Sequence, residues 1–146
     1  MAYIKDLRKL VGAMPLILNS AGAIIRNHEG HLLLEYRNDT NDWGIPGGYM
    51  EPGETFEETI RRELIEELSI TVTSLNFLNI YSGKDYFHEY PNGDKVYSIM
   101  AMFEATIHHD IKTDHKEIGR VNYFSFDYLP KDLTLTTQKI LSGIFR

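Results

Sequence analysis

The chain has 146 residues, a length at which one core can bury most of the apolar surface, so we expect a single domain spanning residues 1–146. It contains no cysteine, which excludes disulfides, thiolate nucleophiles and cysteine-based zinc sites, and it is compatible with a reducing, cytoplasmic location. The net charge is -6 and no run of Lys or Arg forms a basic stripe, so stable nucleic-acid binding is not expected and a phosphate ligand would need cations as mediators.

The N-terminal segment has some features of a secretion signal. Basic residues precede an apolar stretch, and Ala21–Ala23 is similar to a signal-cleavage site. Asp6 and Pro15 interrupt this pattern, so we favour a first strand of the domain over Leu16–Arg26. No apolar run approaches the ~20 residues that span a membrane, and we expect no membrane segment.

Two β-forming segments follow each other closely. Leu16–Arg26 and His31–Arg37 are apolar and are separated by the turn residues Asn27–Gly30, a pattern that predicts a β-hairpin. The next segment, Trp43–Gly48, combines glycines with a proline, which restrict the backbone to special conformations. We therefore expect a shaped loop after the second strand.

The strongest helix signal begins at Thr55, where Thr55 and Glu58 form a capping-box pattern. Apolar residues then recur at every fourth position: Phe56, Ile60, Leu64 and Leu68. Because these positions share one arc of a helix, we expect a helix over residues 55–68 that is docked against the core.

The rest of the chain predicts two more strands before a final strand and helix. Leu75–Tyr81 and Val96–Ile107 are strand candidates, with a turn signature at Pro91–Asp94 between them. Val121–Phe126 predicts a further strand and Thr134–Phe145 a closing helix. Since strands outnumber helices, the order predicts an α/β (α+β) sandwich in which helices flank a mixed sheet.

Three carboxylates of the helix, Glu63, Glu66 and Glu67, stand at positions i, i+3 and i+4. This spacing brings them to one face, where like charges repel unless a cation compensates them. Magnesium prefers oxygen ligands and binds through a few carboxylates together with substrate phosphates. The alternative is a solvated acidic helix surface without a ligand.

A longer pattern surrounds these glutamates and resembles the Nudix box of the Nudix hydrolase (MutT-like) family. The matching positions are Gly48, Glu54, Arg62, Glu63, Leu64, Glu66, Glu67 and Ile70. One position departs, because Ser69 stands where the pattern has a glycine after the helix. Glycine suits a left-handed C-cap, and serine costs ~1 kcal/mol more there. The departure concerns helix termination and leaves the acidic residues unchanged.

The resemblance implies a metal-dependent hydrolase. Glu63, Glu66 and Glu67, with the Gly48 carbonyl, would hold Mg²⁺ or Mn²⁺, and water would attack a phosphoanhydride while a carboxylate takes the proton. The glutamate that acts as base varies within the family. Glu117 lies in a loop that carries a base or extra ligand in some members; the alternative is an ordinary exposed loop acid.

Four further residues are candidates for the site, three through the resemblance and Arg37 through its position after the second strand. Arg62 and Glu54 would support the site, Arg62 by orienting the acids and Glu54 by bracing the loop. Arg37 could bind a substrate phosphate through its forked donors, and Tyr86 could stack on a base. The alternatives are a surface arginine at a strand end and a tyrosine that packs within its strand.

We therefore predict cleavage of a phosphoanhydride in a nucleoside diphosphate linked to another moiety, such as a nucleoside triphosphate, an ADP-ribose-like molecule or a dinucleoside polyphosphate. The expected partner is this small molecule, and the protein would be a monomer or homodimer. One alternative is a non-catalytic nucleotide-binding sensor on the same fold. Another is an interaction module whose acidic helix binds a basic partner.

Overall fold

The computed structural model describes residues 2–107 and 118–144, and Glu117 lies outside the described residues. Two short 3₁₀ helices, η1 (Lys84–Tyr86) and η2 (Phe126–Tyr128), accompany the longer elements. The helices and strands follow in the order α1 (Ala2–Val11), β1 (Leu16–Ile25), β2 (Leu32–Arg37), β3 (Asp42–Gly44), β4 (Gly47–Tyr49), α2 (Phe56–Leu68), β5 (Ser74–Tyr81), β6 (Phe87–Glu89), β7 (Lys95–Thr106), β8 (Ile118–Phe124) and α3 (Leu135–Ile144).

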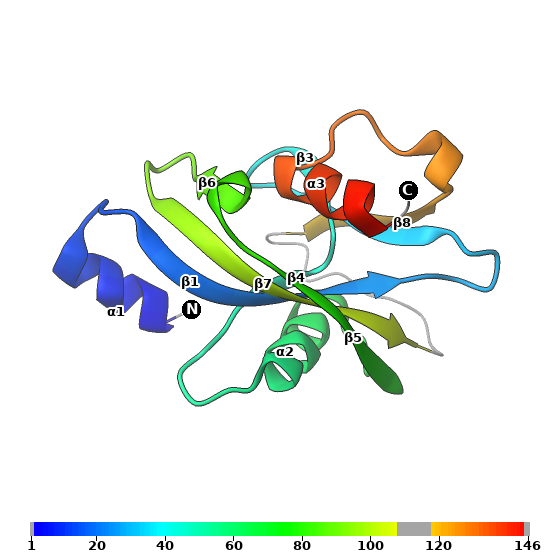
Figure 1. Cartoon of the computed structure of the whole chain (residues 1–146), viewed down its shortest axis with the longest axis horizontal. Coiled ribbons are helices and arrows are strands. Elements are labelled where there is room, and N and C mark those ends of the chain that lie inside the picture. The colour runs from blue at the N-terminus through cyan, green and yellow to red at the C-terminus, as the bar shows by residue number, and fades with distance from the viewer. Residues whose placement is uncertain (1, 108–117, 145–146) are drawn as a thin grey trace.

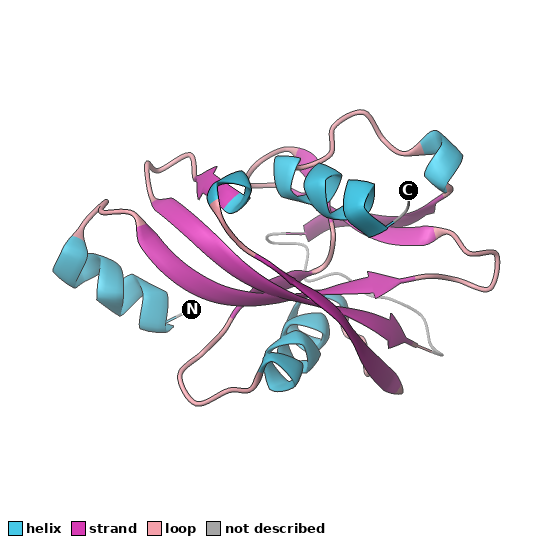
Figure 2. Ribbon diagram, in the orientation of Figure 1, coloured by secondary structure: helices cyan, strands magenta, loops and turns pink. Residues whose placement is uncertain are grey.

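The strands form two sheets. The larger has the order β4-β1-β7-β5, with β6 also paired to β7, and the smaller has the order β3-β2-β8. β1 and β7 run parallel over their whole paired length, whereas the other pairs are antiparallel. Helix α2 lies on one side of the long strands and α3 on the other (Figures 1 and 2). This arrangement confirms the predicted sandwich of a mixed sheet flanked by helices.

The predicted hairpin between the first two strands is wrong. β1 and β2 belong to different sheets and share a single isolated bridge between Arg26 and Leu32. β7 pairs with all ten residues of β1, more than the six residues of β2 could match. The better partner for β1 therefore comes from a distant part of the sequence, and β2 pairs with β3 and β8 instead.

Helix α2 has the predicted start, face and end. The Thr55 side chain accepts a hydrogen bond from the Glu58 amide, and the Glu58 side chain accepts one from the Thr55 amide, which completes the capping box. Ile60, Leu64 and Leu68 have almost no exposed surface and pack on the larger sheet. Ser69 adopts the left-handed conformation at φ 56° that the family pattern assigns to glycine.

Helix α1 is not predicted by the sequence analysis, which considered this segment only as a signal. Its apolar side chains pack on the start of β1 and β7: Ile4, Leu7 and Val11. The Arg8 guanidinium fastens the helix by donating to the Lys95 carbonyl at 2.8 Å. None of the helices in the described ranges has the length and apolar character needed to cross a bilayer.

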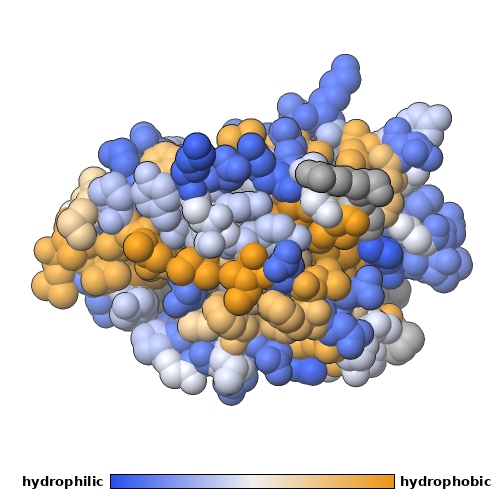
Figure 3. All heavy atoms as spheres, in the orientation of Figure 1, coloured by the Kyte–Doolittle hydropathy of each residue, from blue (hydrophilic) through white to orange (hydrophobic). Residues whose placement is uncertain are grey.

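Strand β5 forms an edge of the larger sheet and carries exposed apolar side chains. Phe77, Leu78 and Ile80 are each more than a third exposed. Figure 3 shows an apolar band across the face on which β5 lies. This exposed edge differs from the pocket described next, whose lining includes several charged side chains.

Candidate active site

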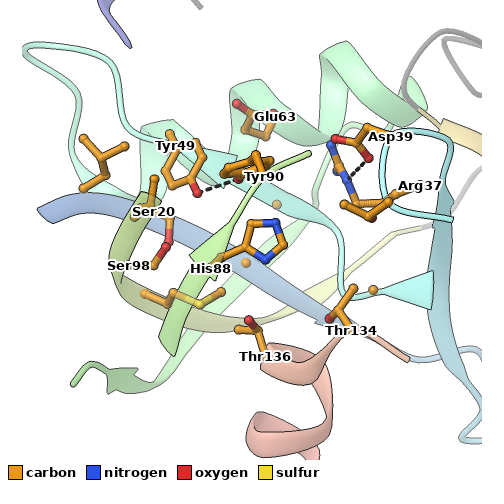
Figure 4. A pocket seen from close by; sticks show the side chains of 18 of the residues that line it. Ser20, Arg37, Asp39, Tyr49, Glu63, His88, Tyr90, Ser98, Thr134 and Thr136 are labelled. Atoms are coloured by element: carbon orange, nitrogen blue, oxygen red, sulfur yellow. Dashed lines mark hydrogen bonds and ion pairs between the residues drawn. The ribbon is translucent and has the colours of Figure 1, made fainter. Parts of the chain in front are cut away.

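A pocket of about 620 Å³ lies between the ends of several elements. Its wall is formed in part by α1, the β4 segment, α2 and the β6–β7 turn, and it includes Gly48, Glu63, Glu67 and Arg37. Figure 4 shows Glu63 entering from α2 and Arg37 from the end of β2, with His88 between them and Thr134 and Thr136 at the start of α3. Residues far apart in the sequence therefore share one concave site.

Gly48 is at the closest contact between the glycine segment and α2. A Cβ atom at this position would lie 2.3 Å from Cδ of Glu63, far inside the contact distance that atoms allow. Gly48 is paired with Ala21 of β1, so its backbone cannot move away without breaking the sheet. The Glu63 carboxylate therefore lies directly against the Gly48 main chain because residue 48 has no side chain.

The three helix glutamates differ in burial. Glu63 and Glu67 are buried and line the pocket, whereas the Glu66 side chain is 59% exposed. The structure thus brings two of the three acids together and leaves Glu66 on the rim of the helix. Within residues 2–107 and 118–144, no three acidic or histidine side chains are arranged closely enough to hold a metal ion by themselves.

Arg62 is the centre of a first group of ion pairs, here called the Arg62 network: Arg62, Glu54, Glu63 and Glu66. Its Nε and Nη2 donate to Glu54 at 2.6 and 3.0 Å, and Nη1 donates to Glu63 at 2.9 Å and Glu66 at 3.3 Å. Nη2 also donates to the Tyr49 carbonyl at 2.8 Å. The Arg62 guanidinium thus connects α2 to β4 and to the loop between them.

Glu54 receives further hydrogen bonds in this network. The Glu51 amide and the Thr59 hydroxyl both donate to its Oε1, at 2.8 and 3.1 Å. The hydrogen bonds from Arg62, followed by the one from the Glu51 amide, lower the pKa of Glu54 to about 2 against the opposing effect of burial. Glu54 therefore stays charged and braces the loop ahead of the helix.

Arg37 is the centre of a second group, here called the Arg37 network: Arg37, Glu35, Glu67 and Asp39. Its Nη1 donates to Glu35 at 3.2 Å and to Glu67 at 3.4 Å, and its Nε donates to Asp39 at 3.3 Å. Glu35 has no exposed surface and Glu67 almost none. The sequence analysis suggested Arg37 as a phosphate ligand but did not single out Glu35 or Asp39.

The carboxyls of this network are not fully satisfied. Within the described residues, no hydrogen-bond donor reaches Oε2 of Glu35 or Oε1 of Glu67, although both atoms are buried. Burial, opposed by the charge of Arg37, raises the pKa of Glu35 to about 7; burial and the nearby Glu35 carboxylate raise that of Glu67. A buried carboxylate in this condition is suited to bind a cation, which would lower its pKa again.

The pocket contains aromatic and imidazole groups that the sequence analysis did not identify. Tyr49 and Tyr90 join their hydroxyls at 2.6 Å and tie β4 to the turn after β6. The His88 ring stands edge-on to Tyr90 with 4.3 Å between centroids, and burial lowers the pKa of its imidazole. Three-residue strands give no periodic signal, so only the pairing of β6 with β7 places these side chains here.

Of the predicted site residues that the structure describes, Tyr86 lies away from the pocket, and Glu54, Arg62 and Glu66 stand behind or beside its wall without lining it. The Tyr86 ring lies 5.7 Å from the Tyr81 ring and packs with the core around Ile140. It is not among the residues that line the pocket. Glu117 falls outside the described residues, so its role stays a prediction.

The family assignment follows from comparison with known proteins. The NUDIX domain model matches residues 17–142, which is most of the chain, and the chain belongs to this family. Among solved structures, the MutT NUDIX hydrolase from Burkholderia pseudomallei superimposes with a TM-score of 0.74 at 24% identity, covering 88% of this chain and 98% of that one. This likeness agrees with the mixed fold described above.

Two curated relatives carry named activities. The NAD-capped RNA hydrolase NudC of Pectobacterium atrosepticum is 32% identical over 75% of this chain, and the chain spans 38% of that protein. The nucleoside triphosphatase NudI of Escherichia coli O81 is 27% identical over 81% of this chain and 89% of that protein. Hydrolases of this family generally use divalent metal ions. Helix α1 precedes the matched segment.

Proposed function

We propose that this protein is a Mg²⁺- or Mn²⁺-dependent pyrophosphohydrolase that cleaves a phosphoanhydride in a nucleoside diphosphate linked to another moiety. The observation that carries this proposal is the placement of Glu63 and Glu67 in one pocket, beside the Gly48 main chain, with a buried oxygen of Glu67 that accepts no hydrogen bond from the described residues. Family membership supports the same reaction class.

The residues present fit a divalent cation. Glu63 and Glu67 supply carboxylate oxygens and Gly48 supplies a backbone carbonyl, which are the hard ligands that magnesium takes. Glu66 would bind from the helix rim, where its exposure lets its side chain rotate. Because these groups do not form a closed site by themselves, substrate phosphate oxygens and water would complete the coordination.

Each step of the hydrolysis can be assigned to groups of this chain. The cation, when bound, lowers the pKa of a bound water and neutralises charge on the phosphoryl oxygens. A carboxylate of the site takes the proton of the attacking water; a new P–O bond forms, and the anhydride P–O bond breaks to release a phosphate-ended product. Arg62 orients Glu63, and Arg37 binds phosphate oxygens at the pocket wall.

The substrate would extend from the glutamates into the rest of the pocket. His88, Tyr90 and the threonines Thr134 and Thr136 line the part opposite α2 and offer stacking surface and hydrogen-bond partners for a nucleoside (Figure 4). The named substrates of the relatives, NAD-capped RNA and nucleoside triphosphates, share a nucleoside linked to a phosphoanhydride. We propose the shared chemical group as the substrate class.

The decisive experiment compares the wild type with Glu67→Gln. Product release is measured from nucleoside triphosphates, ADP-ribose, dinucleoside polyphosphates and NAD-capped RNA, with and without Mg²⁺. We expect metal-dependent turnover by the wild type and a loss of at least ~100-fold in Glu67→Gln, because a ligand or base of the reacting water is removed. Glu117→Gln tests whether the base lies in the loop instead.

Controls separate the hydrolase from the alternatives. Glu57→Gln changes an exposed glutamate of the same helix outside the pocket and should leave turnover unchanged. Nucleotide binding by the wild type with no product from the whole panel would support a sensor and contradict the hydrolase. Unchanged turnover in Glu67→Gln would contradict the proposed site.

We also propose that residues 1–146 act as one domain in the cytoplasm, with a small nucleotide derivative as partner. The monomer or homodimer state is tested by light scattering coupled to size-exclusion chromatography. The exposed apolar edge at β5 makes a dimer testable by Phe77→Ser, which would shift a β5-mediated dimer to monomer.

A further inference from the structure

Glu35 is a carboxylate at a position where the sequence around it is apolar. It follows Leu32, Leu33 and Leu34, and none of the four side chains has exposed surface. Strand alternation places Glu35 on the same side as Leu33, which belongs to the core under α2. Burial of a carboxylate is unfavourable unless its oxygens are paired, so an apolar residue would be the simpler choice here.

The Glu35 side chain accepts a hydrogen bond from Arg37, and the Glu67 carboxyl lies close enough to interact with it directly. Nη1 of Arg37 donates to Oε1 of Glu35 and to Oε2 of Glu67, so one nitrogen joins a carboxylate of β2 to a carboxylate of α2. Asp39 holds the guanidinium at Nε. The Arg37 side chain is 24% exposed, which keeps it beside the pocket with little freedom to turn away.

The free oxygens of this network argue against a purely stabilising role. Oε2 of Glu35 and Oε1 of Glu67 are buried, and no donor in the described ranges reaches them. A buried polar network that serves only stability is favourable when every member is satisfied, and an apolar replacement is often more stable than a partly satisfied one. Buried carboxylate oxygens without a hydrogen-bond donor are expected where the group must remain available to a ligand.

We propose that Glu35 is a positioning residue of the active site: by sharing the Arg37 guanidinium, it keeps Arg37 from closing fully onto Glu67. This inference rests on the proposed function, since Glu67 is there a group of the reacting site. If Glu35 is removed, Arg37 loses one of its carboxylate partners, and Glu67 and Asp39 are still beside it. The guanidinium then moves toward Glu67 and competes with a cation for its oxygens.

The test uses variants that separate hydrogen bonding from charge. Glu35→Leu has a similar size without an acceptor, and Glu35→Gln keeps an acceptor for Arg37 without the charge. We expect Glu35→Leu to lower kcat and the affinity for Mn²⁺ alone by about tenfold, with KM changed less than about twofold. Glu35→Gln should restore both to within about threefold of the wild type. Mn²⁺ binding is measured by electron paramagnetic resonance without substrate.

Glu104→Leu is the matched control, because Glu104 is also a strand carboxylate paired with a single arginine, Arg26 at 3.7 Å, and does not line the pocket. It should bind Mn²⁺ and turn over substrate like the wild type. Circular dichroism and thermal unfolding check that each variant is folded. If Glu35→Leu does not fold, Glu35→Met provides a second side chain without an acceptor.

Two results would overturn the proposal. Unchanged Mn²⁺ affinity and kcat in Glu35→Leu would show that Arg37 is not redirected. Equal impairment in the Leu and Gln variants would mean that charge, not the shared hydrogen bond, is what matters. If the wild type binds Mn²⁺ but hydrolyses none of the panel, the proposed function fails, and the comparison of Mn²⁺ affinities still tests the role of Glu35. A wild type that binds no Mn²⁺ would overturn the proposed function and the role of Glu35 together.

Discussion

The Arg62 network and the Arg37 network lie in the same site and differ in how fully their polar groups are paired. In the Arg62 network, the guanidinium bonds three glutamates and a backbone carbonyl, and Glu54 also accepts from the Glu51 amide and the Thr59 hydroxyl. In the Arg37 network, two buried carboxylate oxygens accept nothing from the described residues. Both networks use one arginine and three acids.

The consequence appears in the pKa values of the acids. Hydrogen bonds from Arg62 lower the pKa of Glu54 to about 2, whereas burial raises the pKa of Glu35 to about 7. A satisfied network fixes charge and geometry, and an unsatisfied one keeps its acids ready to bind a proton or cation. In the proposed site, Arg62 and Glu54 therefore support the candidate ligands Glu63 and Glu66, whereas the Arg37 network holds buried acids that are available to a proton or cation.

The largest effect is expected from Gly48→Ala, which disturbs Glu63 in the satisfied network. The new Cβ would overlap the Glu63 carboxylate, so the carboxylate must leave its place. We expect activity to fall by at least ~100-fold, since a displacement of about 1 Å at a reacting site has this cost. Steady-state kinetics on the best substrate measures it.

The control for this change is Gly143→Ala, because an added Cβ at Gly143 in α3 has no neighbour within 4 Å. It should leave activity unchanged and raise stability by about 0.5–1 kcal/mol, as alanine favours the helix. Equal activity of Gly48→Ala and wild type would contradict the close contact between Gly48 and Glu63.

Exchange of each arginine for lysine tests the comparison directly. Arg62→Lys loses the forked hydrogen bonds to Glu54 and the bond to the Tyr49 carbonyl, so we expect a loss of about 2–3 kcal/mol and a Tm lower by roughly 5–12 °C. Arg37→Lys should lower Tm less and kcat/KM by about tenfold. Differential scanning calorimetry and kinetics measure the two effects. The opposite order, with Arg37→Lys the less stable variant, would reverse the assigned roles.

The pH dependence of stability should have two limbs of opposite sign. The folded pKa of Glu54 is about 2 against an ordinary 4.5, so its contribution is present above pH 4.5 and is lost as the pH falls toward 2. The folded pKa of Glu35 is about 7, so the folded state holds its proton more tightly and stability declines as the pH rises from 4.5 toward 7.

Single variants should weaken one limb each. In urea titrations from pH 2.5 to 8 without divalent ions, Glu54→Gln should flatten the acid limb. Glu35→Gln should make the limb above pH 4.5 shallower, and Glu67, whose pKa burial also raises, accounts for the part that remains. Glu57→Gln, at an exposed position on the first turn of α2, should leave both limbs in place. An acid limb that persists in Glu54→Gln would disprove the assignment.

The smallest effect concerns the helix that carries acids of both networks. Ser69 has a left-handed backbone at φ 56°, so Ser69→Gly should raise stability by about 1 kcal/mol and Tm by roughly 3–5 °C with no change in activity. Ser142→Gly, within α3, should instead lower stability by about 0.5 kcal/mol. A Tm that falls in both variants would show that the backbone strain at Ser69 is offset by contacts of its side chain.

Much of α2 could be predicted because its signals are local. The capping box lies within four residues, and the spacing of Ile60, Leu64 and Leu68 reports the buried face. The same spacing predicted that the three glutamates are neighbours, but it could not predict their burial. Glu67 lies under Arg37 of β2 and Glu66 lies at the surface, and this difference depends on strands elsewhere in the chain.

Other features could not be predicted for the same reason. The long apolar run of β1 is compatible with several strand partners, and the sequence does not report that β7, about 80 residues later, matches it better than β2. The apolar positions Ile4, Leu7 and Val11 of helix α1 have a local helical spacing, but the helix is held by Arg8 at the Lys95 carbonyl, a contact between distant parts of the chain. Glu35 stands in an apolar strand, where no local pattern assigns it a partner.

The sequence by itself determined the family and the helix that carries the glutamates, because fixed spacings along one chain segment express both, whereas the need for a small residue at Gly48 comes from its contact with Glu63 in the fold. The tertiary structure alone decided which acids face the pocket, that Arg37 joins Glu35 to Glu67, and that His88 and Tyr90 line the opposite wall. Helix hydrogen bonds join residues four positions apart, whereas a pocket is assembled from strands whose pairing no local pattern specifies.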